Sequence, residues 1–406
     1  MKMKRQIALL VISAFLISLL PVRDSTAVKA ASPALTEKIT NSDYELKNPR
    51  TNADGMTTWD CVWFGSYWQE DTNGDGKADK NDAKQPIKWR VLSVDGDDAF
   101  LLADKNLDCQ RYHDTEKDVT WETCTIRSWL NGYGAEANQE GKDYSGDNFL
   151  DNAFTPEEQS AIETTCVANN NDNAHYPTEG GNDTSDKVYL LSLNEVMNEV
   201  YGFSSNDLKE DENRRAKNTE YAKGKGAWTS SYTEFAGNGC WWFRSPGDVS
   251  SYASYGGALG DVNDYGCDVN RHDVVVRPAL HLKLKASSDA ISASDWSYAG
   301  TVISEKIRPA KVVSVKLKQK KRTVTVSWKK VKRAAGYYSV AGYQICYSTS
   351  KKWKGKKQKQ TRKTKLNIKE LKKKKTYYFR VRAYWLDGEE KVYGAWSKTK
   401  KITIKK

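Results

Sequence analysis

The sequence predicts an α+β module followed by an all-β sandwich, and three observations indicate this arrangement. Residues 32–304 carry strand-like patterns at both ends and helix-like patterns in the middle. Residues 309–406 carry a series of short alternating strand patterns separated by turns. The charge also changes sign: residues 305–406 hold 34 Lys and Arg against 5 acidic residues, a net charge of +29, and residues 32–304 hold 25 against 46, a net charge of −21. The chain is therefore expected to join an acidic module to a very basic one.

The first residues have the features of a secretory signal peptide. Lys2, Lys4 and Arg5 precede an apolar stretch of about sixteen residues, and small residues follow it. The stretch is short for a membrane span and ends at Pro21, although an uncleaved membrane anchor is the alternative. We predict that residues 1–31 are removed and that the mature chain has no transmembrane segment. The protein is then extracellular, either secreted or associated with the cell envelope.

Strand patterns open the first module. Residues 32–55 are polar and predict a linker or an edge strand, and residues 57–69 are rich in aromatic residues and predict a strand, a turn and a second strand. Further along, Ile87 and Trp89 alternate with polar residues, and Asp95-Gly96 provides the turn of a hairpin.

Helices are expected in the middle of the module, and each has a start or stop signal. The four predicted helices are one that starts near Thr123 and stops at Gly132, one with a capping box formed by Thr155 and Glu158, one that starts at Ser192, and one over residues 212–224.

An Asp-rich loop between the first strands has the spacing of a calcium-binding loop. Gly76 permits the sharp turn at the sixth position, and oxygen donors occupy the ligand positions around it. These donors are Asp71, Asn73, Asp75, Lys77 through its backbone carbonyl, Asp79 and Asp82. The last position is Asp rather than Glu, and strands flank the loop, so the expected calcium ion is structural rather than regulatory. An exposed polar turn without metal is the alternative.

Residues 240–282 predict the ligand-binding part of the module. Their ends, CWWFRSPGD and VVVRPALHLKL, indicate a hairpin-like pair of core strands, and a loop rich in Gly, Tyr, Ser and Asp lies between them. Aromatic faces stack on sugar rings and arginine makes bidentate contacts, so this stretch provides candidate ligand-binding residues. The candidates are Trp241, Trp242, Arg244, Tyr252, Tyr255 and Asp264.

Each of these candidates also has a structural interpretation. Alternation along a strand should bury one of Trp241 and Trp242 and expose the other. Arg244 could instead pair with an acid at the edge of the core, and Arg277 before Pro278 is more typical of a residue that locks a loop. None of the four histidines lies in a Ser, Cys or metal motif, so no catalytic residue is assigned.

Seven cysteines are candidates for disulfide bonds in an exported protein. Cys346 lies in an alternating strand pattern and is expected to be a buried free thiol. Many pairings of the other six are open, and a bridge between Cys240 and Cys267 would close the loop described above. No Cys-x-x-Cys spacing occurs and histidine is scarce, so cysteine-bound metal is not expected.

The motifs FGSYWQ, IKWRVL, IRSWLNG, AFTPEEQ, YLLS, CWWFRSPG and VRPAL give the first module a family resemblance. In this order they resemble an uncharacterised domain family of secreted proteins in Gram-positive gut bacteria, over about residues 56–285. This resemblance implies no established activity. The WW-x-RSPG and VRPAL motifs also look like the closing hairpin of C-type-lectin-like and formylglycine-generating-enzyme-like folds, and this implies a lectin-like expectation for the module. The paired active-site cysteines that formylglycine-generating chemistry needs are not found in this sequence.

Residues 309–406 resemble a fibronectin type III domain, an immunoglobulin-like sandwich, after a linker at 286–308. Trp328 in VTVSWKKV is placed as a core tryptophan, and Leu371 followed by Tyr377 has the arrangement of a tyrosine corner. Such domains commonly serve as spacers or adhesion modules.

The lysine-rich runs of the last domain predict a polyanionic partner. For an exported protein the nearest polyanions are teichoic acids, other anionic wall polymers and host glycans, so nucleic acid is not the expected partner. A merely soluble cationic surface is the alternative.

The function predicted from the sequence is a secreted or cell-surface binding or adhesion protein for a carbohydrate or protein ligand. An extracellular enzyme acting on glycans or on another protein, which would need a deep pocket near Trp242 and Arg244, and a structural surface protein without ligand are the other two candidates.

Overall fold

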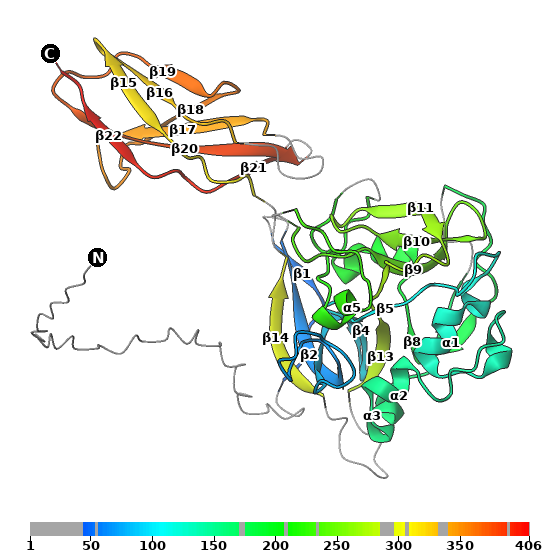
Figure 1. The fold of residues 1–406 in the computed structure, drawn as a ribbon. Coiled ribbons are helices and arrows are strands. Elements are labelled where there is room, and N and C mark those ends of the chain that lie inside the picture. Colours follow the sequence, from blue (N-terminus) through cyan, green and yellow to red (C-terminus); the bar gives the residue numbers. More distant parts are fainter. Residues whose placement is uncertain are drawn as a thin grey trace, which may run out of the picture. The chain divides into compact units, whose positions relative to one another are not determined.

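The computed structural model describes most of the chain after residue 43 (Figure 1). The described residues are 44–52, 56–169, 175–206, 210–232, 235–284, 296–304, 308–331, 340–387 and 390–405. The predicted signal peptide at 1–31 lies outside them. One hydrophobic core extends from Leu46 to Trp296, and a second one from Val312 to Ile404. Among the residues that the structure describes, every helix falls short of the length and apolarity needed to cross a lipid bilayer.

A seven-stranded sheet lies at the centre of the first module. Its strands follow the order β1-β2-β3-β4-β13-β8, and β14 pairs with β2. They are β1 (Arg50–Thr51), β2 (Thr57–Tyr67), β3 (Gln85–Asp95), β4 (Asp98–Ala103), β8 (Val188–Tyr189), β13 (Ala279–Lys283) and β14 (Ser297–Ile303). Every one of these pairs is antiparallel. The hairpin predicted at Asp95-Gly96 is confirmed, because Asp95 pairs with Asp98 across the turn.

Strand β2 is continuous, so the turn expected within residues 57–69 is wrong. The register against β3 shifts between Trp63 and Ser66, and Gly65 in this stretch has φ 64°. A glycine with positive φ and a register shift define a β-bulge, which bends a strand without ending it. A Cβ atom on Gly65 would lie 2.5 Å from the Phe154 ring, so the glycine also lets that ring pack on the strand.

A five-stranded sheet carries the segment expected to bind a ligand. Its strands follow the order β11-β10-β9-β12-β5, with β9 in the middle. They are β5 (Asp108–Cys109), β9 (Trp241–Pro246), β10 (Tyr252–Gly256), β11 (Val262–Asp268) and β12 (Val275–Val276). A separate pair consists of β6 (Thr165–Val167) and β7 (Thr184–Asp186).

The hairpin-like pairing expected between the two ends of residues 240–282 is wrong. The next strand in the chain, β10, takes the antiparallel position on one side of β9, and β12 lies on the other side of β9, parallel to it through Val275 and Trp241. The chain then leaves this sheet at Pro278, which lacks an N–H group for a ladder, and β13 joins the other sheet.

The helices are short, and most of their predicted signals are confirmed. They are α1 (Thr125–Asn131), α2 (Phe149–Ala153), α3 (Pro156–Ala161), α4 (Leu193–Val196) and α5 (Glu220–Gly224), with 3-10 turns at Trp121–Thr123, Ala135–Ala137 and Glu199–Tyr201. Gly132 ends α1 in the left-handed conformation, and the capping box of Thr155 with Glu158 is present. The helix expected over 212–224 covers only α5, because Arg214 is buried and donates to backbone carbonyls of other segments.

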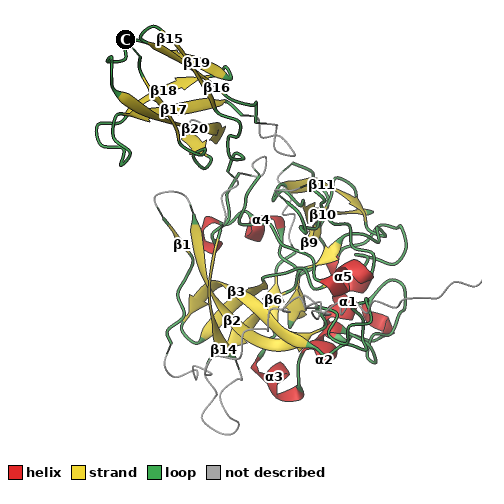
Figure 2. Ribbon diagram, turned by 60° about the vertical axis from the view of Figure 1, so that its left-hand side comes forward, coloured by secondary structure: helices red, strands yellow, loops and turns green. Residues whose placement is uncertain are grey.

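Strands therefore dominate the first module, as the yellow ribbons of Figure 2 show. Each described α-helix has seven residues or fewer. The module is mostly β with few helices, and the α+β class and the lectin-like fold expected from the sequence are not shown.

The module also reaches further along the chain than expected. Trp296 is buried in its core, β14 pairs with β2, and the Tyr298 ring stacks on that of Tyr44 at 3.7 Å. The linker predicted at 286–308 therefore contains part of the folded module.

The last domain is a sandwich of two sheets. The strand orders are β15-β16-β19 and β18-β17-β20-β21, and β22 pairs with β20. The strands are β15 (Lys316–Lys320), β16 (Thr323–Ser327), β17 (Gly342–Ser348), β18 (Lys357–Thr361), β19 (Lys365–Ile368), β20 (Thr376–Asp387), β21 (Glu390–Tyr393) and β22 (Lys400–Thr403). Trp328 is buried as expected, and the Tyr377 hydroxyl accepts the Lys372 N–H at 3.1 Å, which closes the predicted tyrosine corner.

The bulge in β2 leads to a stability prediction. Gly65→Ala should lower the free energy of unfolding by about 2 to 4 kcal/mol, because the new methyl group overlaps the Phe154 ring and the backbone φ is positive. Gly96→Ala is the control: its φ is also positive but no atom lies within 4 Å, so about 1 kcal/mol is expected. Urea denaturation of both variants measures the difference, and equal losses would show that packing on Phe154 contributes nothing.

Candidate functional site

The two tryptophans expected to contact a ligand lie inside the module. All six residues of β9 are buried, and Trp241 and Trp242 are both 0% exposed. Their indole N–H groups donate to the backbone carbonyls of Arg214 and Gln110 at 3.2 and 3.0 Å. The expectation that one of the two is exposed is wrong, because β9 is a central strand covered on both faces.

Arg244 on β9 is also buried. Its guanidinium group pairs with the Glu195 carboxylate and donates to the backbone carbonyls of Leu190 and Ala168 at 2.9 and 3.0 Å. These contacts join the start of α4 and the end of β6 to the central strand. Arg244 thus makes the acid pairing that was its structural alternative.

The solvent-facing candidates lie on the neighbouring hairpin β10–β11. Tyr252 and Asp264 are partly exposed. Tyr255 is also partly exposed, but burial raises its pKa to about 12, and its hydroxyl accepts the Asn263 amide at 2.9 Å. Tyr252, Tyr255 and Asp264 are thus the sequence candidates that reach the surface, and the Tyr255 hydroxyl is held by Asn263.

Three tyrosines gather around this hairpin, and we call Tyr176, Tyr252 and Tyr265 the tyrosine cluster. The ring centroids of Tyr252 and Tyr265 are 5.9 Å apart, and those of Tyr176 and Tyr265 are 6.1 Å apart, both in edge-to-face arrangements. Tyr265 is 51% exposed. Gly247 makes this approach possible, because a Cβ atom there would lie 2.4 Å from the Tyr265 carbonyl oxygen.

Carboxylates surround the tyrosine cluster. Asp268 is the main cause of the raised pKa of Tyr252. The pKa of Tyr176 is raised by partial burial and then by Asp264 and Asp248. The His175 ring contacts the Asp264 carboxylate and borders the same surface.

The sequence missed His175, Tyr176 and Tyr265 as members of this site. His175 and Tyr176 lie in a polar segment that reads as an exposed loop, far from β10 and β11 along the chain. Tyr265 follows Asp264 within the loop-like stretch and has no spacing signal of its own. Only the pairing of β10 with β11 and the return of residues 175–178 bring these rings together.

The Asp-rich loop is held by its own side chains. The Asp82 carboxylate accepts the backbone N–H groups of Thr72, Asn73 and Asp79, and these bonds lower its pKa to about 2. Both Asp71 oxygens accept N–H groups of Gly74 and Gly76. Within the described residues, no group of three or more His, Cys, Asp or Glu side chains is placed to hold a metal ion. The loop is therefore ordered by hydrogen bonds in this geometry, and calcium binding by it stays a prediction.

All seven cysteines are free thiols, so the bridge expected between Cys240 and Cys267 is not formed. Cys240 precedes β9 and Cys267 lies on β11, with β10 between them. Strands on either side of a third one are about 9 to 10 Å apart, beyond the usual Cα separation of a disulfide. Cys346 is buried.

This arrangement predicts the reactivity of the thiols. Burial raises the pKa of Cys240 to about 11 and that of Cys267 to about 12, whereas Cys166 is exposed. Iodoacetamide at pH 8 should modify Cys166 first in the native chain, because the thiolate is the reactive form. Urea-unfolded chain, in which all seven thiols should react, is the control. A native chain whose mass is lower by two hydrogen atoms than that of the fully reduced chain, and in which Cys240 and Cys267 do not react after unfolding, would contradict the assignment of these two residues as free thiols.

The fold and the site define a two-domain protein with a mostly β first domain and a C-terminal sandwich. Residues 96–284 match the family described as "Domain of unknown function (DUF6273)", and residues 308–399 match the family described as "Fibronectin type III domain". The chain thus carries a DUF6273 domain followed by a fibronectin type III domain, which is consistent with a binding or structural surface protein. Strands β2 and β3 precede residue 96 but belong to the same core, so the folded unit is larger than the matched region.

Solved structures similar to this chain include single fibronectin domains. The sixth fibronectin type III domain of human fibronectin type III domain containing protein 3 is 16% identical, with 25% of this chain and 91% of that chain covered and a TM-score of 0.22. A structure described as "Myokine structure" is 18% identical, with 24% and 99% covered and a TM-score of 0.20. The FN1–FN3 domains of chicken CNTN1 are 23% identical, with 27% and 37% covered and a TM-score of 0.22. No curated protein matches this chain.

Proposed function

We propose that this chain is a secreted binding protein that holds a ligand at the tyrosine cluster of its first module. Its basic fibronectin type III domain keeps it at anionic envelope polymers or host glycans. The tyrosine cluster, in which Tyr265 is exposed and Tyr176 and Tyr252 are partly exposed, is the observation that carries the proposal. Three phenol rings offer apolar faces and hydroxyl groups for hydrogen bonds at low conformational cost, as binding surfaces require.

The charge around the tyrosine cluster limits the class of ligand that the cluster can bind. Asp248, Asp264 and Asp268 lie near the rings, so an anionic ligand would be repelled. Hydroxyl groups of a ligand can donate hydrogen bonds to these carboxylates, and an ammonium group of a ligand can also lie over a phenol ring. A neutral or amine-bearing glycan therefore fits best, and a basic peptide segment is the second candidate.

The enzyme alternative is less well supported than a binding role. It requires a pocket with converging titratable groups near Trp242 and Arg244. Both side chains are buried and bonded to backbone carbonyls or to Glu195, so protein atoms fill the space around them.

Loss of one tyrosine ring should weaken ligand binding. Tyr265→Ala in the full chain is expected to reduce binding to the recognised glycans about tenfold, since an aromatic contact contributes about 0.5 to 1.5 kcal/mol beyond its buried area. A glycan array followed by titration of the strongest hits measures this effect.

Tyr232→Ala is the matched control, because Tyr232 is 56% exposed and Tyr265 51% exposed. Equal binding by both variants and the wild type would refute the tyrosine cluster as the ligand site. If no glycan binds but lysine-rich peptides do, the peptide alternative replaces the glycan.

We also propose that the Asp-rich loop binds one structural calcium ion. Calorimetric titration of the full chain should give one site with a dissociation constant of about 10⁻⁴ to 10⁻³ M. At 10 mM calcium the stabilisation should then be about 1.4 kcal/mol or more, seen as a raised melting temperature. Asp75→Ala should abolish both effects, whereas Asp95→Ala, which changes an exposed turn elsewhere, should leave them intact. Absence of heat and of a melting shift in the wild type would leave the loop as a hydrogen-bonded turn.

A further inference from the structure

The fibronectin type III domain carries an alternating stack of arginines and aromatic rings, which we call the arginine ladder. It consists of Trp353, Arg380, Trp396, Arg382 and Tyr393. The Arg380 guanidinium carbon lies 4.1 Å from the ring centroid of Trp353 and 4.4 Å from that of Trp396. The Arg382 guanidinium carbon lies 4.4 Å from Trp396 and 3.8 Å from Tyr393. Each guanidinium group thus lies against two aromatic rings.

The ladder lies on the outer face of the sheet that contains β17 and β20. Arg380 and Arg382 alternate along β20 with the buried residues Phe379 and Val381, so their side chains point away from the core. Two positions on the same face of one strand are about 7 Å apart. The ladder is therefore a fixed pair of positive charges at a spacing set by the backbone.

Among the side chains that the structure describes in this domain, which do not include those of Asp387 and Glu390, no carboxylate pairs with these two charges. The described polar partner of the Arg382 guanidinium is the Gln344 amide oxygen, at 2.8 Å. The Arg380 Nε atom is buried and has no hydrogen-bond partner among the described residues. Burial and the charge of Arg380 both lower the pKa of Arg382, as expected for cations held together without a counter-ion.

Trp353 is held over Arg380 by an unusual backbone conformation. Its φ is 62°, a left-handed value that bulky side chains rarely adopt, and its N–H donates to the Ser350 carbonyl at 3.0 Å. The adjacent residues Lys352 and Lys354 are exposed. The strained turn therefore brings one ring onto the ladder and two further positive charges to its end.

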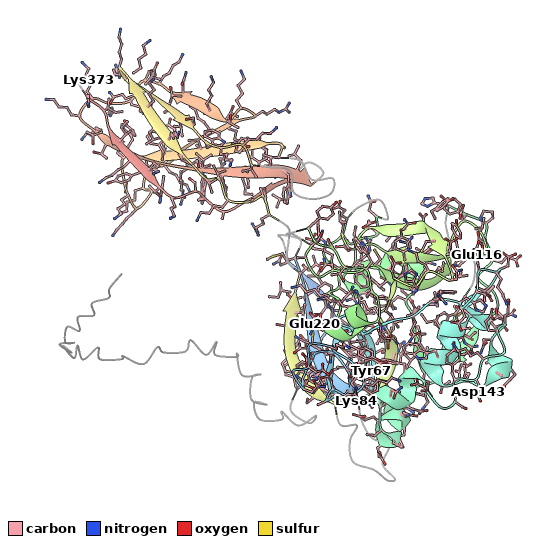
Figure 3. All side chains as sticks on the ribbon, viewed as in Figure 1. Tyr67, Lys84, Glu116, Asp143, Glu220 and Lys373 are labelled. Carbon is pink, nitrogen blue, oxygen red and sulfur yellow. The ribbon has the colours of Figure 1, made fainter. Side chains whose placement is uncertain are left out.

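We propose that the arginine ladder binds neighbouring phosphate groups of a linear polyol phosphate polymer, and this rests on the envelope-binding part of the proposed function. The aromatic rings cover the guanidinium faces, so the N–H groups at the guanidinium edges are the atoms left for a ligand. Those edges match the oxygens of a phosphate, and the exposed residues Lys352 and Lys354 beside Trp353 add positive charge. Figure 3 shows the side chains of this domain, with Lys373 of another loop labelled.

The same geometry argues against single-stranded nucleic acid and against neutral sugars. Both would need open aromatic faces for stacking. The Trp396 ring is instead in contact with two guanidinium groups, and the Tyr393 ring with one. The ladder is thus suited to recognise charge rather than rings.

The test is binding of the full chain to poly(glycerol phosphate) at physiological salt, with heparin and an oligothymidylate as comparators. Arg380→Gln should weaken binding to poly(glycerol phosphate) by about tenfold or more, since hydrogen bonds to charged groups are strong. Arg362→Gln is the matched control, because it removes the same charge from an exposed loop outside the ladder and should weaken binding less than about fivefold.

Trp353→Asn provides a second variant that keeps the fold, because asparagine tolerates the left-handed backbone. It should retain the wild-type melting temperature and bind poly(glycerol phosphate) more weakly than Arg362→Gln does. Equal losses in Arg380→Gln and Arg362→Gln would show a diffuse cationic surface and overturn the ladder as the site. Tighter binding to heparin or to oligothymidylate would overturn the polyol phosphate. If the wild type binds none of the three polymers, the envelope-binding part of the proposed function fails as well.

Discussion

Two fully buried guanidinium groups, Arg214 and Arg277, hold the first module together. A buried arginine needs acceptors for its N–H groups, and here backbone carbonyls provide most of them. Arg277 donates to the carbonyls of Ala103 and Arg214 at 2.8 and 3.0 Å and lies over the Trp241 ring. Arg214 donates to the carbonyls of Val196 and Gly260 at 2.8 and 3.0 Å. These bonds connect the two sheets and the irregular segments between them, which have few regular backbone bonds of their own.

The need of the buried arginines for backbone acceptors explains why the aromatic strand β9 has a structural role. The Trp241 indole donates to the same Arg214 carbonyl that accepts from Arg277, so both side chains depend on one backbone oxygen. Strand β9 must then lie in the middle of its sheet, and its tryptophans cannot face solvent. The surface that remains for recognition is the adjacent hairpin, where Gly247 allows Tyr252 and Tyr265 to approach each other.

The surface aromatic side chains of the two domains have neighbours of opposite charge. In the first module, the rings of the tyrosine cluster are accessible and carboxylates surround them. In the fibronectin type III domain, the Trp396 ring contacts two guanidinium groups, and the Trp353 and Tyr393 rings contact one each. The net charges of −21 for residues 32–304 and +29 for residues 305–406 follow the same division. Rings among acids suit neutral or cationic ligands, and rings that hold guanidinium groups suit anions.

The sequence alone determined the features that depend on neighbouring residues. The hairpin at Asp95-Gly96, the stop at Gly132 and the capping box of Thr155 with Glu158 need only a few adjacent side chains, and the structure confirms them. The tyrosine corner of the last domain is equally local, since Tyr377 bonds to Lys372.

The tertiary structure decided which side chains reach solvent and which segments become neighbours. A strand covered on one face and a strand covered on both can share one sequence pattern, so alternation could not show that Trp241 and Trp242 are both buried. The parallel pairing of β12 with β9 and the meeting of Tyr176 with Tyr265 join segments far apart in the chain. Such contacts depend on how the sheets pack, and packing is a property of the whole core rather than of any one stretch of sequence.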